Sequence, residues 1–173
     1  MDKQLVKAEA RRLAAGFMGE GYVPRALHHY TDKNGVLIYS RMRLYHPEKK
    51  EKLIRPFYER DGHYILGEPK FDGKKPLYQL PLIKDAETVF WVEGEPKVDA
   101  LIKLGLVATT SGGATSHDSV DLEPCRGKSV VIWPDADDSG KTHAKAVKTL
   151  LEKLDCDVAL IVLISSIYLL REM

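Results

Sequence analysis

The chain has 173 residues, a length that accommodates one ordinary domain with a small appended unit. With 44% hydrophobic residues, 29% charged residues and two cysteines, its composition excludes a disordered, a collagen-like or a disulfide-rich protein. The net charge of +1 hides an asymmetry, because residues 1–75 contain 16 lysines and arginines against 10 acids, whereas residues 76–173 contain 10 against 15. A basic half favours a polyanionic partner, and an acidic half favours cations.

Residues 1–20 are predicted to form an N-terminal amphipathic helix. Over residues 2–18, apolar side chains recur at helical intervals at Leu5, Ala8, Leu13 and Phe17. Charges are scattered through this segment, so it does not resemble a secretory signal. The longest apolar stretch, residues 158–170, falls short of the roughly 20 residues that a membrane-spanning helix needs. We therefore expect a cytoplasmic protein with no membrane partner.

Residues 21–84 are predicted to form a small, basic, antiparallel β-rich unit. Two β-rich runs flank Asn34-Gly35 and two more flank Asp61-Gly62, and both dipeptides are typical of hairpin turns. Basic side chains interleaved with aromatic ones on a sheet are typical of a single-stranded nucleic-acid surface, although exposed strands are also charged for solubility. The residues expected to contact nucleic acid here are Arg41, Arg43, Arg55, Lys74 and Lys75.

Residues 85–173 change to alternating strands and helices. Apolar runs predict strands at 88–92, 106–110, 129–133 and 158–163, and helical periodicity predicts helices at 96–105 and 139–154. This alternation favours an α/β domain with a parallel sheet covered by helices. In such sheets, ligands gather at the carboxyl ends of the strands.

Two acidic clusters follow two of these predicted strands. Glu93 comes directly after the first strand, and the segment "VVIWPDADDSG" places Asp135 and Asp137 after a later one. If the strands are neighbours, these carboxylates converge at one edge, where they form a set of hard oxygen ligands that suits Mg²⁺ or Mn²⁺. Asp138 is expected to cap the following helix instead. The alternative for all these acids is a role as helix caps and solvated loop residues.

The segments "VFWVEGEPKVDALIKLGLVATTSGGATS" and "GKSVVIWPDADDSGKTHA" resemble the TOPRIM domain, which occurs in primases, in type IA and type II topoisomerases and in OLD-type nucleases. They are most similar to the version found in phage and plasmid primases. The resemblance also includes the upstream β-rich segment and covers roughly residues 27–162. It implies a Rossmann-like TOPRIM fold, a parallel sheet with flanking helices, for residues 85–173, preceded by the antiparallel β-rich unit.

The resemblance also implies roles for single residues. Glu93 matches the glutamate assigned to acid/base work or metal binding, and Asp135 and Asp137 match the metal-holding pair. Glu95 and Asp99 are candidate additional metal ligands. Lys97 stands where bacterial replicative primases usually carry an acid, and the acid at position 99 instead follows the spacing of the phage and plasmid branch. The candidate phosphate-binding residues are Lys97, Gly112 and Gly113. Lys128 or Lys141 could bind the phosphate in place of Lys97, and the two glycines could instead form only a sharp turn.

The implied activity is that of a Mg²⁺-dependent DNA primase, a nucleotidyltransferase that makes RNA primers on single-stranded DNA during phage or plasmid replication. Its expected partners are single-stranded DNA, nucleoside triphosphates, and a replicative helicase or other replication proteins. A TOPRIM nuclease and a non-catalytic DNA-binding or assembly module remain the alternatives. The family usually continues with a further acidic motif where this sequence stops at "LISSIYLLREM", which leaves open a truncated or inactive form.

Overall fold

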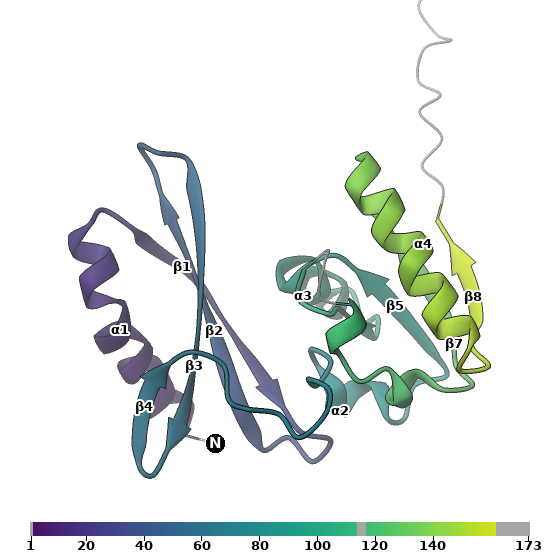
Figure 1. The fold of residues 1–173 in the computed structure, drawn as a ribbon, viewed down its shortest axis with the longest axis horizontal. Helices are drawn as coiled ribbons and strands as arrows, with labels where there is room; N and C mark the ends of the chain where they lie inside the picture. The colour runs from purple at the N-terminus through teal and green to yellow at the C-terminus, as the bar shows by residue number, and fades with distance from the viewer. Residues whose placement is uncertain (1, 114–116, 162–173) are drawn as a thin grey trace, which may run out of the picture. The chain divides into compact units, whose positions relative to one another are not determined.

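The computed structural model describes residues 2–113 and 117–161, and the chain divides into two compact units. Unit 1 comprises the residues up to 85 together with 119–124, and unit 2 comprises 86–118 and the residues from 125 onward. Unit 1 contains a four-stranded antiparallel sheet and unit 2 a four-stranded parallel sheet with helices, which confirms the predicted α/β architecture (Figure 1). In the described ranges, every helix is too short or too polar to cross a bilayer.

Unit 1 begins with one helix and continues as a meander of hairpins. Its sheet has the strand order β1-β2-β3-β4, and all three pairings are antiparallel. The predicted turns at Asn34-Gly35 and Asp61-Gly62 lie between paired strands, which confirms both hairpins. The elements are α1 (Lys3–Gly19), β1 (Val23–Thr31), β2 (Leu37–His46), β3 (Glu51–Arg60), β4 (His63–Leu66) and the short helix α2 (Leu80–Ile83).

The buried face of α1 differs from the predicted one. Val6, Ala10 and Ala14 are the buried residues of this helix, whereas Leu5 is 49% exposed and Ala8 is also exposed. The buried positions recur every four residues and form one continuous stripe against the sheet, and the predicted Leu13 and Phe17 pack against the same core while Leu5 and Ala8 do not. The stripe packs on a core contributed by the strands, namely Met42, Leu44 and Phe57.

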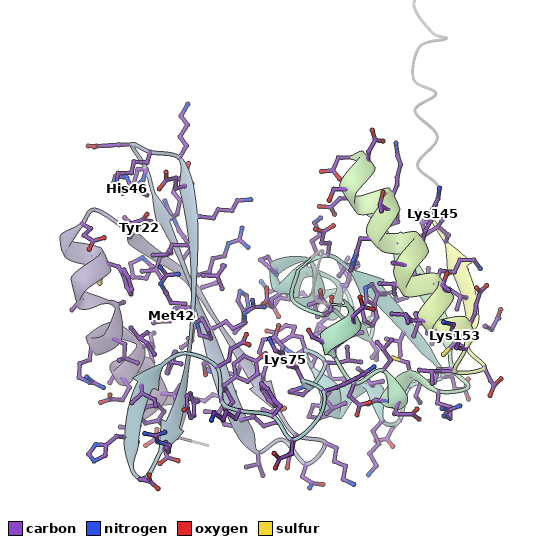
Figure 2. All side chains as sticks on the ribbon, viewed as in Figure 1. Tyr22, Met42, His46, Lys75, Lys145 and Lys153 are labelled. Atoms are coloured by element: carbon purple, nitrogen blue, oxygen red, sulfur yellow. The ribbon has the colours of Figure 1, made fainter. Side chains whose placement is uncertain are left out.

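A tight corner joins the end of α1 to the end of β2. Gly21 adopts a left-handed backbone with φ of 96°, and a Cβ atom at this position would lie 2.9 Å from the imidazole Nε2 of His46. The same imidazole contacts the Glu20 carbonyl at 3.0 Å, and its ring meets that of Tyr22 edge-on at 5.0 Å (Figure 2). Glycine suits this position, because the positive φ strains any other residue and an added Cβ would press against the imidazole of His46.

The opposite face of the sheet in unit 1 carries an aromatic cluster. Tyr30 and Tyr39 are paired across β1 and β2 and their rings stack at 4.5 Å. Tyr78 and Phe71, from the segment after β4, pack against these rings at 5.1 and 5.8 Å. Both tyrosines of the sheet are thereby buried, so this part of the face is core and not a binding surface.

Unit 2 contains the predicted alternation of strands and helices, although β6 covers only two of the five residues predicted at 106–110 and β8 ends at Leu160, with 162–163 of the predicted strand outside the described residues. Its sheet order is β6-β5-β7-β8, and all three pairings are parallel. The two central strands supply most of the buried residues, namely Val89, Trp91, Val92, Val130 and Ile132, whereas Trp133 and Leu160 at strand ends are 39% and 38% exposed. The elements are β5 (Thr88–Val92), α3 (Glu95–Lys103), β6 (Ala108–Thr109), the 3-10 turns η1 (His117–Ser119) and η2 (Glu123–Cys125), β7 (Ser129–Trp133), α4 (Asp138–Glu152) and β8 (Asp157–Leu160).

Candidate functional site

The carboxyl ends of β5 and β7 lie side by side in unit 2, and the chain leaves the two strands in opposite directions. From β5 it passes through α3 to β6 on one side, and from β7 it passes through α4 to β8 on the other. In open parallel sheets, ligands bind in the crevice at such a reversal, beyond the carboxyl ends. Glu93 directly follows Val92, the last residue of β5, and Asp135 comes two residues after Trp133, the last residue of β7. Val92 and Trp133 are paired, so both acids lie at this crevice.

The pKa of Glu93 is shifted by burial and by the charged groups on the other side of the crevice. Burial raises the pKa of its carboxyl group above the ordinary value, the Asp135 carboxylate raises it further, Lys97 lowers it, and Asp137 adds a smaller increase. Two acids from the end of β7 therefore lie close enough to Glu93 to interact with it. Glu95 and Asp99 are not among the described charges that shift this pKa.

Lys97 lies at the centre of this charge cluster. It is located in the first turn of α3, and its ammonium group forms an ion pair with the carboxylate of Asp135. The side chains of Lys97 and Asp135 are 49% and 34% exposed, so the ion pair is accessible to solvent and to ions. The positive charge among the acids is thus supplied by a lysine of the chain itself, at the position where a phosphate contact was predicted.

Asp137, not Asp138, caps α4, which corrects the prediction. The Asp137 side chain accepts a hydrogen bond from the Gly140 N–H at 2.7 Å, and its extended backbone is that of an N-cap residue. Asp138 is the first residue of the helix, where its exposed carboxylate pairs with Lys141 at 3.0 Å. The helix begins one residue earlier than the periodicity of its apolar side chains suggested, and this shift moves the cap from Asp138 to Asp137.

Gly140 brings the first turn of α4 against the loop that carries the acids. A Cβ atom here would lie 2.7 Å from the backbone oxygen of Asp135, 2.8 Å from its Cβ and 2.9 Å from its nitrogen. Because these are mostly backbone atoms, a larger residue at position 140 would displace the loop. The sequence predicted only that a helix starts near Gly140, and this close approach was not foreseen.

The loop after β5 is fixed by a buried threonine that sequence reasoning missed. Thr110 is fully buried just after β6, and its hydroxyl oxygen accepts hydrogen bonds from the N–H groups of Gly94 and Gly112, both at 3.1 Å. Gly94, with φ of 83°, is the N-cap of α3 and follows Glu93 directly. Thr110 thereby connects the loop that carries Glu93 to the turn after β6. Its position directly after a predicted strand could have identified it as a residue that organises the carboxyl edge of the sheet.

The remaining predicted residues of unit 2 lie on α3 or have other hydrogen-bond or ion-pair partners. Glu95, only 5% exposed, is the first residue of α3, and Asp99 follows one turn later on that helix. The Gly112 N–H is used within its own turn, and Gly113 accepts a hydrogen bond from the Ser111 hydroxyl at 3.2 Å. The alternative phosphate-binding lysines are also engaged. Lys128 donates to the Ala86 carbonyl at 2.6 Å, and Lys141 binds Asp138.

The crevice also contains a cavity of about 300 Å³ beside the ion pair. Its walls come from α3 and the end of β7, and it is largely apolar apart from the Lys97–Asp135 pair. A cavity of this size, with few polar groups converging on one edge, has the character of a small ligand site. The lining residues are Val92, Lys97, Ala100, Leu101, Trp133, Pro134 and Asp135.

The acids of the crevice fit a magnesium ion in their chemistry. Glu93, Asp135 and Asp137 offer only oxygen, the donor that Mg²⁺ and Mn²⁺ prefer. Among residues 2–113 and 117–161, no three acidic, histidine or cysteine side chains are grouped closely enough to hold a metal ion. Magnesium commonly takes one or two carboxylates and completes its shell with water and substrate phosphate, so the pair of Glu93 and Asp135 is a sufficient protein contribution.

The predicted nucleic-acid-binding arginines of unit 1 do not share one face. Arg55 is paired with Met42, on the face that packs against α1, and its guanidinium lies 5.2 Å from the ring centre of Phe17. Arg41 and Arg43 alternate with Met42 along β2 and therefore lie on the other face. The structure thus brings two of the three arginines together and separates the third.

Arg25 joins the two arginines of β2. The pairing of β1 with β2 is irregular between Pro24 and Ala26, which leaves Arg25 as an extra, bulged residue. Its guanidinium lies 5.6 Å from the ring centre of Tyr45, a residue on the same face of β2 as those arginines. Sequence reasoning missed Arg25 because a bulge changes the alternation of side chains along the strand.

The predicted lysines of unit 1 differ in their surroundings. Lys75 forms an ion pair with Glu68, and its backbone bonds to Ser119 and Asp121 at 2.8 and 2.7 Å. It therefore fastens the returning segment 119–124 to unit 1. Lys74 lines a cavity of about 600 Å³ whose wall also includes Phe71. Of the two lysines, Lys74 is therefore the one placed to contact a ligand beside an aromatic ring.

Comparisons with protein-family models, with curated proteins and with solved structures found no match. The candidate site in the crevice between β5 and β7 therefore rests on its own geometry.

Proposed function

We propose that the chain is a primase-type nucleotidyltransferase that uses the crevice between β5 and β7 to join nucleotides on single-stranded DNA. The observation that carries the proposal is the placement of Glu93 and Asp135 at the carboxyl ends of adjacent parallel strands, where the chain direction reverses. Phosphoryl transfer needs little covalent chemistry from the protein and depends on positioning and on charge neutralisation at the phosphate.

Each charged residue of the crevice has a role in this proposal. Glu93 and Asp135 would hold Mg²⁺ or Mn²⁺, and the bound ion would neutralise charge on the reacting phosphates. The raised pKa of Glu93 also suits it to exchange a proton with the attacking hydroxyl group. Lys97 would leave Asp135 when a triphosphate enters and would bind the phosphate oxygens. Arg25 and Arg43 would hold the template strand by its phosphates, whereas Arg41 is engaged with Tyr30 of the buried aromatic cluster, to whose hydroxyl it donates a hydrogen bond at 3.4 Å.

The same geometry supports a second candidate, a non-catalytic nucleic-acid-binding module. The Lys97–Asp135 ion pair favours this candidate, because it neutralises one acid of the crevice without a metal. In such a module, Asp137 would serve only as the cap of α4.

The proposal is tested by incubating the protein with Mg²⁺ or Mn²⁺, labelled nucleoside triphosphates and single-stranded DNA. RNA primers made by the native protein and lost in both Glu93→Gln and Asp135→Asn support primase activity. Asp138→Asn is the matched control, because it makes the same change of charge three residues after Asp135, at the start of α4, at a side chain that is 98% exposed. Degradation of the DNA would identify a nuclease, and binding with neither product would identify the non-catalytic module.

A further inference from the structure

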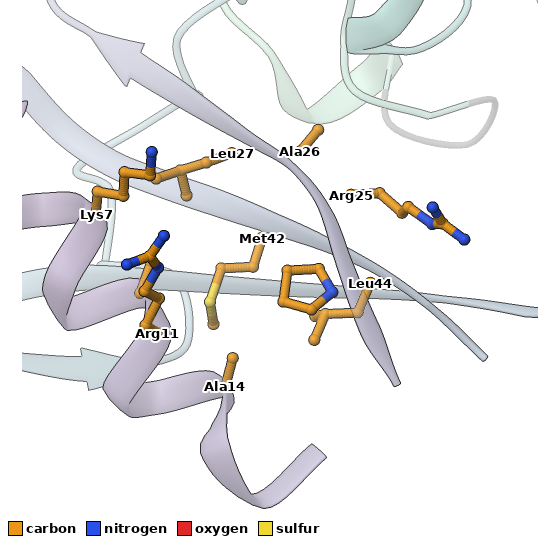
Figure 3. A pocket seen from close by; sticks show the side chains of 10 residues that line it. Lys7, Arg11, Ala14, Arg25, Ala26, Leu27, Met42 and Leu44 are labelled. Atoms are coloured by element: carbon orange, nitrogen blue, oxygen red, sulfur yellow. The ribbon is translucent and has the colours of Figure 1, made fainter. Parts of the chain in front are cut away.

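A second cavity, of about 310 Å³, lies in unit 1 between α1 and the edge strand β1. Its innermost lining is apolar and consists of side chains of α1 and of the sheet that lie opposite each other. Figure 3 shows Met42 extending toward Ala14 across this space, with Leu44 to one side and Leu27 beside Lys7. Met42 and Leu44 are nearly fully buried, whereas Leu27 is half-buried, so the cavity opens at the side of β1. The proposed function does not use this cavity.

Cations line the helix side of the opening. Lys7 and Arg11 are exposed on α1 one turn apart, and both lie over the cavity (Figure 3). Lys3, one turn before Lys7 on α1, continues the same side of the helix toward its N-terminal end. The three residues form a basic stripe along the groove between α1 and β1. Arg25 also lines the cavity, but its guanidinium points away from this stripe.

The basic stripe of Lys3, Lys7 and Arg11 lacks an acidic counterpart in the part of the chain that the structure describes. Within the described ranges, neither Lys7 nor Arg11 forms an ion pair, whereas the neighbouring Arg12 binds Glu9 at 2.7 Å. Like charges spaced one turn apart on a helix destabilise it slightly, so the stripe does not serve the stability of α1. An anionic ligand that lies in the groove would supply the missing charge.

The lining also indicates the kind of anion. No aromatic ring of the described residues lines the cavity, and base stacking on such rings is what single-stranded nucleic acid uses. Aliphatic walls suit an aliphatic side chain instead. The groove runs beside β1, one of the two edge strands of the described sheet, and an edge strand is where an extended peptide commonly binds. Pro24 and the bulge that follows it restrict such pairing to the later part of β1.

We propose that the groove between α1 and β1 binds an extended acidic segment of a partner protein. An aliphatic side chain of that segment would enter the cavity over Met42 and Leu44, and its carboxylates would lie along Lys3, Lys7 and Arg11. This site is separate from the crevice residues of the proposed function, so the two proposals can fail independently.

The test uses the fluorescein-labelled peptide Glu-Glu-Leu-Glu-Glu-Leu-Glu-Glu and the whole chain, with binding followed by fluorescence anisotropy. We expect the charge-reversing pair Lys7→Glu and Arg11→Glu to weaken binding roughly tenfold or more. The matched control is Lys49→Glu with Lys52→Glu, two exposed lysines around the turn from β2 to β3, which should bind like the native protein. A peptide with lysine in place of each glutamate should not bind.

A second readout does not depend on any variant. The methyl group of Met42, labelled with ¹³C, should shift in the NMR spectrum of the native chain when the acidic peptide is added. Absence of peptide binding, an equal loss in the Lys49 and Lys52 control, or an unmoved Met42 signal would overturn the proposal. It would also be overturned if an oligothymidylate shifted the Met42 signal and the peptide did not, because the occupant would then be nucleic acid.

Discussion

The close approach of Gly140 to Asp135 makes a sharp prediction for Gly140→Ala. In a helix interior, replacing glycine by alanine normally stabilises by up to about 1 kcal/mol. At this position the added Cβ would lie 2.7–2.9 Å from three atoms of Asp135, of which two are backbone atoms that no side-chain rotation can move aside. Forcing an extra methyl group into a packed site costs typically 1–3 kcal/mol, so we expect net destabilisation of about 1–2 kcal/mol.

The assay is urea unfolding, followed by far-UV circular dichroism, of Gly140→Ala and of a matched variant in unit 1. Gly16 lies within α1, and a Cβ atom added there would meet no neighbouring atom of the described residues within 4 Å, so Gly16→Ala should stabilise by up to about 1 kcal/mol. The two substitutions are chemically identical, and the predicted effects have opposite signs. If Gly140→Ala were as stable as the native protein, the packing of α4 against the Asp135 loop would be refuted.

Three further predictions concern single side chains. Asp137→Ala should destabilise by about 1 kcal/mol through the lost cap of α4, while Asp137→Asn keeps the cap and should match the native unfolding midpoint. Lys97→Met should raise the affinity for Mn²⁺, measured by calorimetry, by up to about fivefold. The metal would no longer compete with the Lys97–Asp135 ion pair, and an exposed ion pair contributes about 1 kcal/mol or less. Unchanged affinity would show that the ion pair does not hinder metal binding. Burial lowers the pKa of His29, and Lys3 and His28 lower it further, so the folded state disfavours the charged imidazole. The stability that the neutral imidazole of His29 contributes is present above the ordinary pKa of 6.5 and is lost as the pH falls below it. Thermal melts of His29→Gln should therefore show a smaller loss of stability in acid than those of the native protein. An equal loss would contradict this.

The strands and helices of unit 2 could be predicted from the sequence because their signals are local. Continuous apolar runs bounded by glycine and proline specify buried strands, and the run at 129–133 matches β7 residue for residue. Glu93 and Asp135 follow two such strands, so their shared edge of the sheet could be predicted on the condition that the strands are neighbours, and the order β6-β5-β7-β8 meets that condition. The two hairpin turns of unit 1 were equally local.

The errors arose where tertiary contacts decide the outcome. The side of β3 that carries Arg55 depends on the register with β2, which alternation within one strand does not reveal. The buried stripe of α1 depends on which face meets the sheet, and small alanines at positions 10 and 14 gave a weaker hydrophobic signal than Leu5. The partner of Asp135 depends on a lysine 38 positions earlier in the chain, a contact that only the fold creates.

The most direct test of the crevice as a phosphate and metal site is a Mn²⁺ titration followed by electron paramagnetic resonance. The native chain should bind the ion, and Glu93→Gln and Asp135→Asn should each weaken binding roughly tenfold, since each removes one of two carboxylate ligands. Asp138→Asn should bind like the native chain, because its carboxylate is fully exposed and pairs only with Lys141 among the described residues. Equal Mn²⁺ binding by all four proteins would contradict the assignment of Glu93 and Asp135 as the centre of the site.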